Sequence, residues 1–208
     1  EVAVERTGYT APSFGAVAGT SFETWRESLR AALPATAVER DIETELQTFV
    51  GARTDRQLVW QTLRDGTRKI RRVAMWQHDS RERAVETEGR VTLTTLVELG
   101  DALNGHVGVV HGGFTAALLD DLLGQTTMQE ARARGISGAP LTAGLEVRYK
   151  APVMANATYL VRTSTETVSV RDRPGLPSWD VRLTAVVYNG DGHACVEAKS
   201  HYVLKQFA

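Results

Sequence analysis

The chain has 208 residues, of which 42% are hydrophobic, and a formal net charge of −1. This length fits one ordinary domain with an extension, or at most two small domains, and the composition is that of a soluble globular protein. The near-neutral charge argues against nucleic acid as a partner, and no apolar run approaches the roughly 18 residues of a membrane span. We therefore expect neither nucleic-acid binding nor integral membrane association.

The single cysteine, Cys195, excludes an intrachain disulfide framework and fits a reducing compartment. It lies in a strand-like run, where a small buried hydrophobic residue is favoured over a reactive thiol. Because the sequence begins at Glu1 and not at Met, we expect a processed or truncated product from which any targeting segment has been removed. The predicted location is intracellular, in the cytoplasm or the mitochondrial matrix.

The first part of the chain, residues 1–56, predicts an N-terminal arm followed by a helical extension. Residues 1–20 are rich in Gly, Ala, Ser and Thr without a clear period, which indicates an irregular arm. A helix is predicted from Ser21, whose hydroxyl can cap it, to Pro34, which ends it. A second helix is predicted over residues 37–49, where apolar side chains recur at helical spacing.

Residues 57–208 change to the period of strands, and we assign them to a separate domain. A hairpin is predicted with strands over residues 57–63 and 69–77, because Asp65-Gly66 is a favoured turn dipeptide. Residues 89–99 alternate in the manner of a half-buried strand. A glycine-rich loop and an apolar helix follow. The helix and four further strands are predicted over residues 113–132, 141–150, 158–170, 178–188 and 193–204.

The predicted helix over residues 113–132 has apolar or small residues on nearly every side, which is typical of a helix that other elements wrap. One such helix amid many antiparallel strands indicates an α+β fold. The sequence thus predicts a curved antiparallel β-sheet wrapped around one long central helix.

The residues that indicate chemistry lie in the loop before this helix and inside it. The loop runs from Asn104 through His111 to Gly112 and Gly113, and Asp120 follows within the helix. Glycines at a helix start expose unpaired N–H groups at the positive end of the helix dipole, where they can stabilise negative charge on an acyl carbonyl oxygen. A carboxylate in an apolar helix is costly unless it is paired or used. Together these features indicate acyl transfer or hydrolysis.

Asp120 shares one face of the helix with Ala116 and Gly124, each four positions away. A carboxylate on a face of such small residues has room beside it for a ligand or a partner helix. The alternative is that Asp120 only hydrogen-bonds a neighbouring strand or a partner chain. The adjacent Asp121 lies about 100° round the helix, and we expect it to be paired or solvated.

This pattern resembles the hotdog-fold acyl-CoA thioesterases, in particular the phenylacetate-pathway and THEM-type branch. That branch carries N-x-x-x-G-x-x-H-G-G, then an Asp nine positions after the His and a small residue beyond it. The matching positions here are Asn104, Gly108, His111, Gly112, Gly113, Asp120 and Gly124. A downstream family strand, T-x-x-L-x-V-x-Y-x-x-P, is matched by Thr142, Leu145, Val147, Tyr149 and Pro152. The resemblance covers roughly residues 70–204 and implies the hotdog fold.

The resemblance implies hydrolysis of acyl-CoA thioesters to a free acid and CoA, without a cofactor or a metal. The carbonyl oxygen would accept a hydrogen bond from the N–H of Gly113, aided by His111 or Gly112. Asp120 would act as general base or as nucleophile, two roles that the sequence leaves open. The family's sites are shared between two subunits, so we expect a homodimer or a dimer of dimers in which Thr142 positions the water.

Several of these positions also have a simpler interpretation. His111 could only pin the loop by hydrogen bonding, and Asn104 could only stabilise its own turn. Gly112 and Gly113 could only mark the start of the helix. The phosphates of CoA call for basic contacts, although exposed basic side chains are usually only solvated. The candidates are Arg148, Lys150, Arg171 and Arg173.

Two other functions compete with hydrolysis. A hotdog hydratase or dehydratase would need a His/Asp or His/Glu pair, and its characteristic D-x-N-P-x-H loop is absent from the sequence. A non-catalytic acyl-CoA-binding or regulatory protein is the second alternative, because a fold does not determine a function. The remaining histidines are scattered without convincing metal-ligand spacing, so structural or surface roles are expected for His78, His106, His193 and His201.

Overall fold

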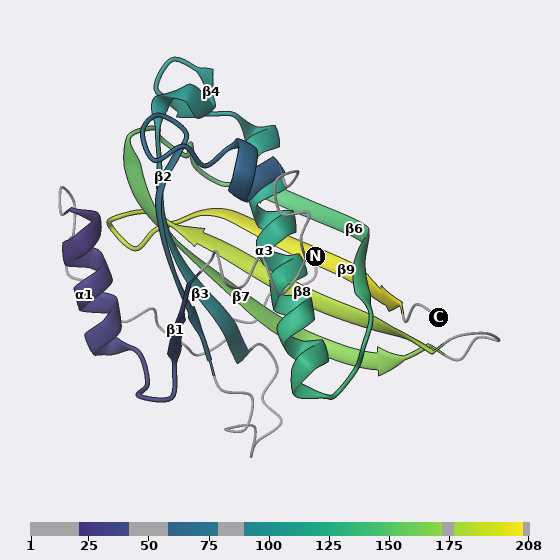
Figure 1. Cartoon of the computed structure of the whole chain (residues 1–208). Coiled ribbons are helices and arrows are strands. Elements are labelled where there is room, and N and C mark those ends of the chain that lie inside the picture. The colour runs from purple at the N-terminus through teal and green to yellow at the C-terminus, as the bar shows by residue number, and fades with distance from the viewer. Residues whose placement is uncertain (1–20, 42–57, 79–89, 172–176, 206–208) are drawn as a thin grey trace.

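A long helix, α3 (Gly112–Ala133), lies across one face of an antiparallel sheet in the computed structural model, which describes residues 21–41, 58–78, 90–171 and 177–205 (Figure 1). Within these residues the sheet has seven strands in the order β1-β2-β3-β7-β8-β9-β6, all neighbouring pairs being antiparallel. The strands are β1 (Val38–Arg40), β2 (Ile70–Gln77), β3 (Arg90–Leu99), β6 (Ala139–Tyr149), β7 (Ala157–Val170), β8 (Ser178–Tyr188) and β9 (Ala194–Lys205). A small hairpin, β4 (Asn104–His106) and β5 (Val109–Val110), precedes α3. This is the hotdog fold that the sequence predicted.

The main core lies between α3 and the inner face of the sheet. Leu119, Leu122 and Leu123 of α3 are fully buried, and they belong to one apolar cluster with inward side chains of the strands, such as Val161 and Leu183. Burying a leucine side chain contributes about 1.5–3 kcal/mol. The leucine-rich turns of α3 therefore hold the helix against the sheet and set the position of its N-terminus.

The opposite face of the sheet carries a second apolar cluster beneath α1 (Phe22–Ala32). Side chains alternate between the faces of a strand, so Trp76 and Leu96 point away from α3 and pack against Phe22 and Trp25. Ser21 caps α1 by accepting a hydrogen bond from the Thr24 N–H at 3.3 Å, as the sequence predicted. The helix thus covers part of the outer face of β2, β3 and β7.

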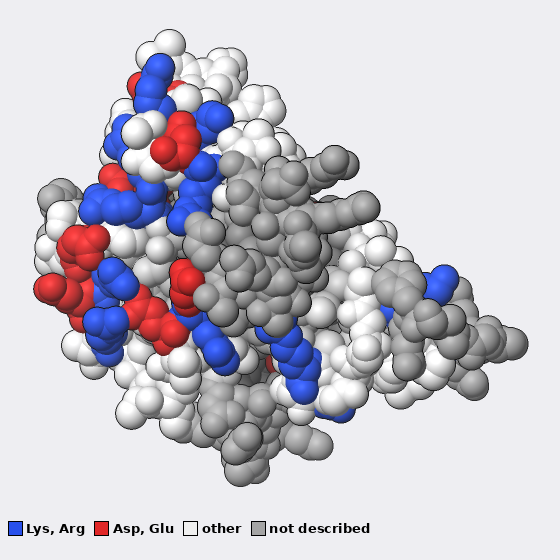
Figure 2. Space-filling view, viewed as in Figure 1, with Lys and Arg blue, Asp and Glu red and all other residues white. Residues whose placement is uncertain are grey.

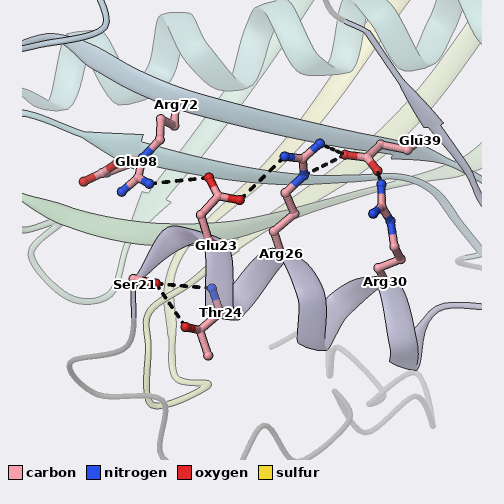
Figure 3. A network of polar contacts seen from close by, with 8 residues as sticks. All are labelled: Ser21, Glu23, Thr24, Arg26, Arg30, Glu39, Arg72 and Glu98. Atoms are coloured by element: carbon pink, nitrogen blue, oxygen red, sulfur yellow. Dashed lines mark hydrogen bonds and ion pairs between the residues drawn. The ribbon is translucent and has the colours of Figure 1, made fainter.

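Ion pairs tie α1 to β1 and β2 and, through Arg72, to β3 (Figure 3). Glu39 of β1 accepts from Arg26 and Arg30 of α1, and although burial opposes its charge, these hydrogen bonds lower its pKa. Arg72 of β2 binds Glu98 of β3 at 2.5 Å and approaches Glu23 of α1. On the face in Figure 2, positive and negative side chains are interspersed over this region. These partly exposed pairs orient α1, while the apolar cluster supplies most of the free energy that holds α1 against the sheet.

The predicted second helix is wrong where the structure can be compared with it. Val38–Arg40 forms β1 and pairs with β2 in the register Val38 to Gln77, so sheet pairing overrides the local helical spacing. The rest of the predicted helix, residues 42–49, lies outside the described residues, as does the predicted arm over residues 1–20. The boundary between residues 1–56 and 57–208 stays a prediction.

The first strand of the predicted hairpin is also wrong. Residues Leu58–Thr62 form one π-helical turn, η2, which puts the Trp60 indole in the main core with 2% of its surface exposed. Within residues 58–78 no hairpin forms, but the chain bends at Asp65, whose carboxylate accepts the N–H groups of Thr67, Arg68 and Lys69, and Gly66 has φ +72°. These backbone hydrogen bonds, led by that of Lys69, lower the pKa of Asp65 to about 2. The conformation of Leu58–Thr62 is therefore set by burial of the Trp60 indole in the tertiary structure.

Candidate active site

The start of α3 is capped by the ring of His111. Its Nδ1 accepts a hydrogen bond from the N–H of Gly113 at 2.9 Å, and its backbone oxygen accepts from Thr115 at 3.1 Å. A ring nitrogen that accepts a hydrogen bond carries no proton, so the neutral imidazole has its proton on Nε2. His111 therefore satisfies one of the free N–H groups of the helix and retains one N–H donor of its own.

The peptide between Gly112 and Gly113 is held at both ends. Its N–H donates to His111, and its oxygen accepts from the hydroxyl of Tyr149 on β6 at 2.6 Å. The N–H of Gly112 itself has no hydrogen-bond acceptor among the described residues. This amide, at the positive end of a 22-residue helix, is available to a negatively charged oxygen.

The hairpin before α3 positions His111. A Cβ atom on Gly105 would lie 3.0 Å from the His111 Cα and Cδ2, so a glycine lets the two segments approach closely. The His111 N–H donates to Leu103 at 2.8 Å. Asn104 is paired with Val110 rather than sitting in a turn, and its exposed side chain forms no hydrogen bond within the described residues. Gly105, which makes room for His111, was not among the residues predicted from the sequence.

Asp120 lies two turns further along α3, against the end of the sheet formed by β6 and β9. Its Oδ1 accepts from the Thr142 hydroxyl at 2.9 Å and from the Tyr202 hydroxyl at 2.6 Å. Its Oδ2 forms no hydrogen bond within the described part of the chain. The structure therefore brings together Asp120 and Thr142, and it adds Tyr202.

Tyr202 was missed because its place depends on strand register. Thr142 of β6 pairs with Tyr202 of β9, so both side chains reach the same turn of α3. The alternating pattern of β9 indicated which of its residues face inward. Nothing in the sequence indicated that Tyr202 stands beside Thr142, because register is a property of the assembled sheet.

The two parts of the candidate site are well separated within one chain. Asp120 follows Gly112 by eight residues in one helix, a rise of about 12 Å at 1.5 Å per residue. A general base or nucleophile and an oxyanion donor must both come within about 3 Å of one reacting group. One chain cannot place its own Gly112 N–H and its own Asp120 around the same carbonyl.

Asp121 is directed to another partner. Its Oδ2 accepts from the indole Nε1 of Trp60 and from Gln125 Nε2 at 2.9 Å. Burial raises the pKa of Asp121 to about 6, although both hydrogen bonds oppose that change. As expected from its place on the helix, Asp121 is paired, and it binds the η2 turn to α3.

The basic candidates do not form one cluster. Arg148 pairs with Glu146 at 2.8 Å, and Lys150 pairs with Glu197, so each is partly neutralised by an acidic neighbour. Both flank Tyr149, which contacts Gly112.

Arg171 is in a different environment, because it pairs with Asp180 at 3.2 Å, and Asp180 also binds His201. His201 is next to the inward-facing Tyr202, so it and its partners lie on the outer face of the sheet, away from Asp120. Arg173 lies outside the described residues.

Within the described residues, no group of three or more His, Cys, Asp or Glu side chains could hold a metal ion. His78 binds the Thr94 hydroxyl at 2.8 Å, which is a structural contact. Cys195 is buried, as its strand-like surroundings predicted. No helix in the described ranges is long and apolar enough to cross a membrane.

No protein-family model matches the chain, and neither does any curated protein sequence. Among solved structures, the chain is similar to thioesterase superfamily member 2 of zebrafish, with 13% identity over 64% of this chain and 82% of that one and a TM-score of 0.45. A hypothetical thioesterase from Streptococcus pneumoniae with coenzyme A has 13% identity over 59% and 89% of the two chains, with a TM-score of 0.43. The protein smu.793 from Streptococcus mutans bound to acetyl CoA has 17% identity over 60% and 94%, with a TM-score of 0.41. Because these identities and TM-scores are low, the fold is assigned from the strand order and the central helix of this chain.

Proposed function

We propose that the protein hydrolyses acyl-CoA thioesters to the free acid and CoA, with Asp120 as general base or nucleophile. The observation that carries this proposal is the state of the Asp120 carboxylate, which has Oδ1 held by two hydroxyl groups and Oδ2 open. An oriented carboxylate with one free oxygen is suited to take a proton from water or to attack a carbonyl carbon. The motif resemblance supplies the substrate class.

The second part of the proposal is that Gly112 is the oxyanion donor. The N–H of Gly113 already has an acceptor in His111, so it is less suited to that task than the sequence suggested. The open N–H of Gly112 lies at the N-terminus of α3, where the helix dipole favours a developing negative charge. The remaining N–H of His111, on Nε2, is a second donor close by.

The third part is that each site is formed by two copies of the chain. Because about 12 Å of helix separates Gly112 from Asp120, a carbonyl bound at Gly112 of one copy would meet Asp120 of the other. Thr142 lies on β6, the last strand of the sheet, and is exposed in the single chain. An open sheet edge is a common place for two copies to join. We therefore propose a homodimer, alone or within a dimer of dimers.

In the general-base form of the reaction, a water molecule held by Thr142 gives a proton to Asp120 as its oxygen bonds to the carbonyl carbon. The negative charge collects on the carbonyl oxygen at Gly112. The carbon–sulfur bond then breaks, and the CoA thiolate leaves and takes up a proton. In the nucleophilic form Asp120 bonds to the carbonyl carbon, the carbon–sulfur bond breaks and the CoA thiolate leaves, and water then hydrolyses the resulting anhydride to the free acid and the Asp120 carboxylate. Arg148 and Lys150, beside Tyr149, are the preferred contacts for CoA phosphates.

The proposal is tested by measuring thiol release from a panel of short, long and aromatic acyl-CoA substrates. The wild-type protein should release thiol from at least one of them. A single turnover in water labelled with oxygen-18 then tests the nucleophilic form, because label in Asp120 requires the anhydride and its hydrolysis at the Asp120 carboxyl carbon. A wild-type protein that is folded and dimeric but releases no thiol from any substrate would overturn the proposed function.

A further inference from the structure

We propose that Tyr202 is a positioning residue for this reaction, which holds the Asp120 carboxylate so that Oδ2 is the oxygen that acts on water or on the thioester. The inference rests on the proposed function and goes beyond the motif, which includes no residue of β9. It assigns different tasks to the two oxygens of one carboxylate.

The contacts of Tyr202 carry this inference. Its hydroxyl lies 2.6 Å from Asp120 Oδ1 and also within hydrogen-bond distance of the Asp120 backbone oxygen. One hydroxyl proton is thus shared between the side chain and the backbone of the same residue, a three-centre arrangement. A donor that bridges these two atoms restricts rotation of the carboxylate about its side-chain bonds. Thr142 adds a second donor to Oδ1 at 2.9 Å.

Burial makes the contact persistent. Tyr202 is 2% exposed, and burial, followed by its hydrogen bond with Asp120, raises the pKa of its hydroxyl above the ordinary value. The hydroxyl therefore stays protonated and can donate over the whole range in which a carboxylate is ionised. A hydrogen bond to a charged group is worth more than one between neutral groups, and more again out of water.

The ring of Tyr202 lies beside the neighbouring turn of α3. Gly124 lies one turn beyond Asp120, and a Cβ atom there would be 3.6 Å from the Tyr202 hydroxyl oxygen. A Cβ at this distance would be in ordinary van der Waals contact, so the hydroxyl end of the ring lies beside the helix at Gly124 with room for little more than a Cβ. Strand register places Thr142 alongside Tyr202, so the hydroxyl groups of both residues can donate to Asp120 Oδ1.

The test is the Tyr202→Phe variant, with Tyr188→Phe as the matched control. Tyr188 is a half-buried tyrosine that packs with the cluster under α1, away from Asp120. Tyr202→Phe should lower kcat about tenfold or more, the effect of losing a hydrogen bond to a charged group, with KM changed less than about twofold. Tyr188→Phe should change neither constant by more than about twofold.

A double-mutant cycle separates positioning from a general structural role. In the Asp120→Ala background, Tyr202→Phe should cause no further loss of the residual activity, because the carboxylate to be positioned is gone. A second, equal loss in that background would show that Tyr202 acts through the fold, and it would overturn the inference. An unchanged kcat in the single variant would do the same.

A crystal structure of Tyr202→Phe makes the inference testable apart from activity. We expect the Asp120 carboxylate to leave the rotamer in which Oδ1 faces β9. If the wild-type protein released no thiol, the proposed function would fail, and this structure alone would decide the geometric claim about Tyr202. An Asp120 carboxylate in an unchanged rotamer would then refute the claim.

Discussion

The Nδ1 atom of His111 accepts the N–H of Gly113 at 2.9 Å, so the histidine of the loop is the N-cap of the central helix. Histidine is not among the residues favoured at this position, where Ser, Thr, Asp and Asn predominate. The contact joins two roles that the sequence left as alternatives, because a ring that pins the loop by Nδ1 still offers its Nε2–H to a ligand. It also moves the open backbone amide from Gly113 to Gly112.

Replacing His111 should therefore affect stability as well as activity. His111→Ala removes the cap and should lower the free energy of unfolding by about 1 kcal/mol, while His111→Asn keeps a capping oxygen and should restore most of it. Urea unfolding of both variants measures this. If His111→Ala is as stable as the wild type, the ring is not an effective cap.

Gly112→Pro removes the N–H that we assign to the oxyanion. Proline is favoured at the first position of a helix, and His111, with φ −62° and ψ 128°, already has the extended conformation that precedes proline. A Cβ on Gly112 would lie 3.4 Å from the Tyr149 ring, which is a tolerable contact. We expect kcat to fall about 100-fold or more with little change in melting temperature. Retained kcat in a folded variant would rule out this amide as the donor.

Asp120→Asn and Asp120→Ala should each lower kcat roughly 100-fold or more, the scale expected for loss of a base or nucleophile. The fold should remain intact, because the carboxylate lies beside β6 rather than inside the main core. Kinetics of thiol release and circular dichroism check both statements. The control is Asp121→Asn, which changes the adjacent carboxylate and should keep activity within a few fold. Near-normal turnover by purified Asp120→Ala would remove Asp120 from the mechanism.

A shared site predicts rescue in mixed dimers. A dimer of one Asp120→Ala chain and one Gly112→Pro chain has one site with both lesions and one with neither. Mixing the two inactive variants under conditions that exchange subunits should therefore restore up to about a quarter of the wild-type activity, since half of the dimers are mixed and each has one intact site. Sites within single chains would regain nothing. Light scattering of the active wild type should give a mass at least twice the 22.7 kDa of one chain.

The buried Asp121 predicts a pH dependence of stability with a definite sign. Burial raises its pKa from the ordinary 3.8 to about 6 in the folded state. Between about pH 4 and pH 6 the folded protein holds a proton that the unfolded chain has lost, so this group's contribution to stability falls as the pH rises through that window. Asp121→Asn keeps an acceptor for Trp60 and Gln125 and removes this loss.

The gain in stability of Asp121→Asn over the wild type should grow across that window and stay constant above it. Two pKa units correspond to a gain on the order of 2–3 kcal/mol at pH 7.5. Urea unfolding of both proteins at pH 4, 5, 6 and 7.5 measures it. Parallel pH profiles for the two proteins would show that Asp121 does not titrate in this range.

The elements whose signals are short-range could be predicted from the sequence alone. α1 follows from the Ser21 cap and the helix-ending Pro34, and the five predicted strands from Arg90 onward lie within two residues of the observed β3, β6, β7, β8 and β9. The spacing of Gly112 and Asp120 along α3 also follows from the sequence, because a helix converts residue separation directly into distance. Caps, turn dipeptides and hydrophobic periods depend on neighbours in the chain, so one sequence is enough to identify them.

The features that depend on distant partners could be seen only in the assembled fold. Tyr202 reaches Asp120 because β9 pairs with β6 in one register, and Leu58–Thr62 turns helically because Trp60 is buried against α3. Val38–Arg40 is a strand because it pairs with the edge of β2. In each case the stabilising free energy comes from contacts between residues far apart in the sequence. A local sequence pattern therefore does not specify these features. The chemistry of Asp120 was indicated by the sequence, and the orientation of its carboxylate is set by the assembled sheet.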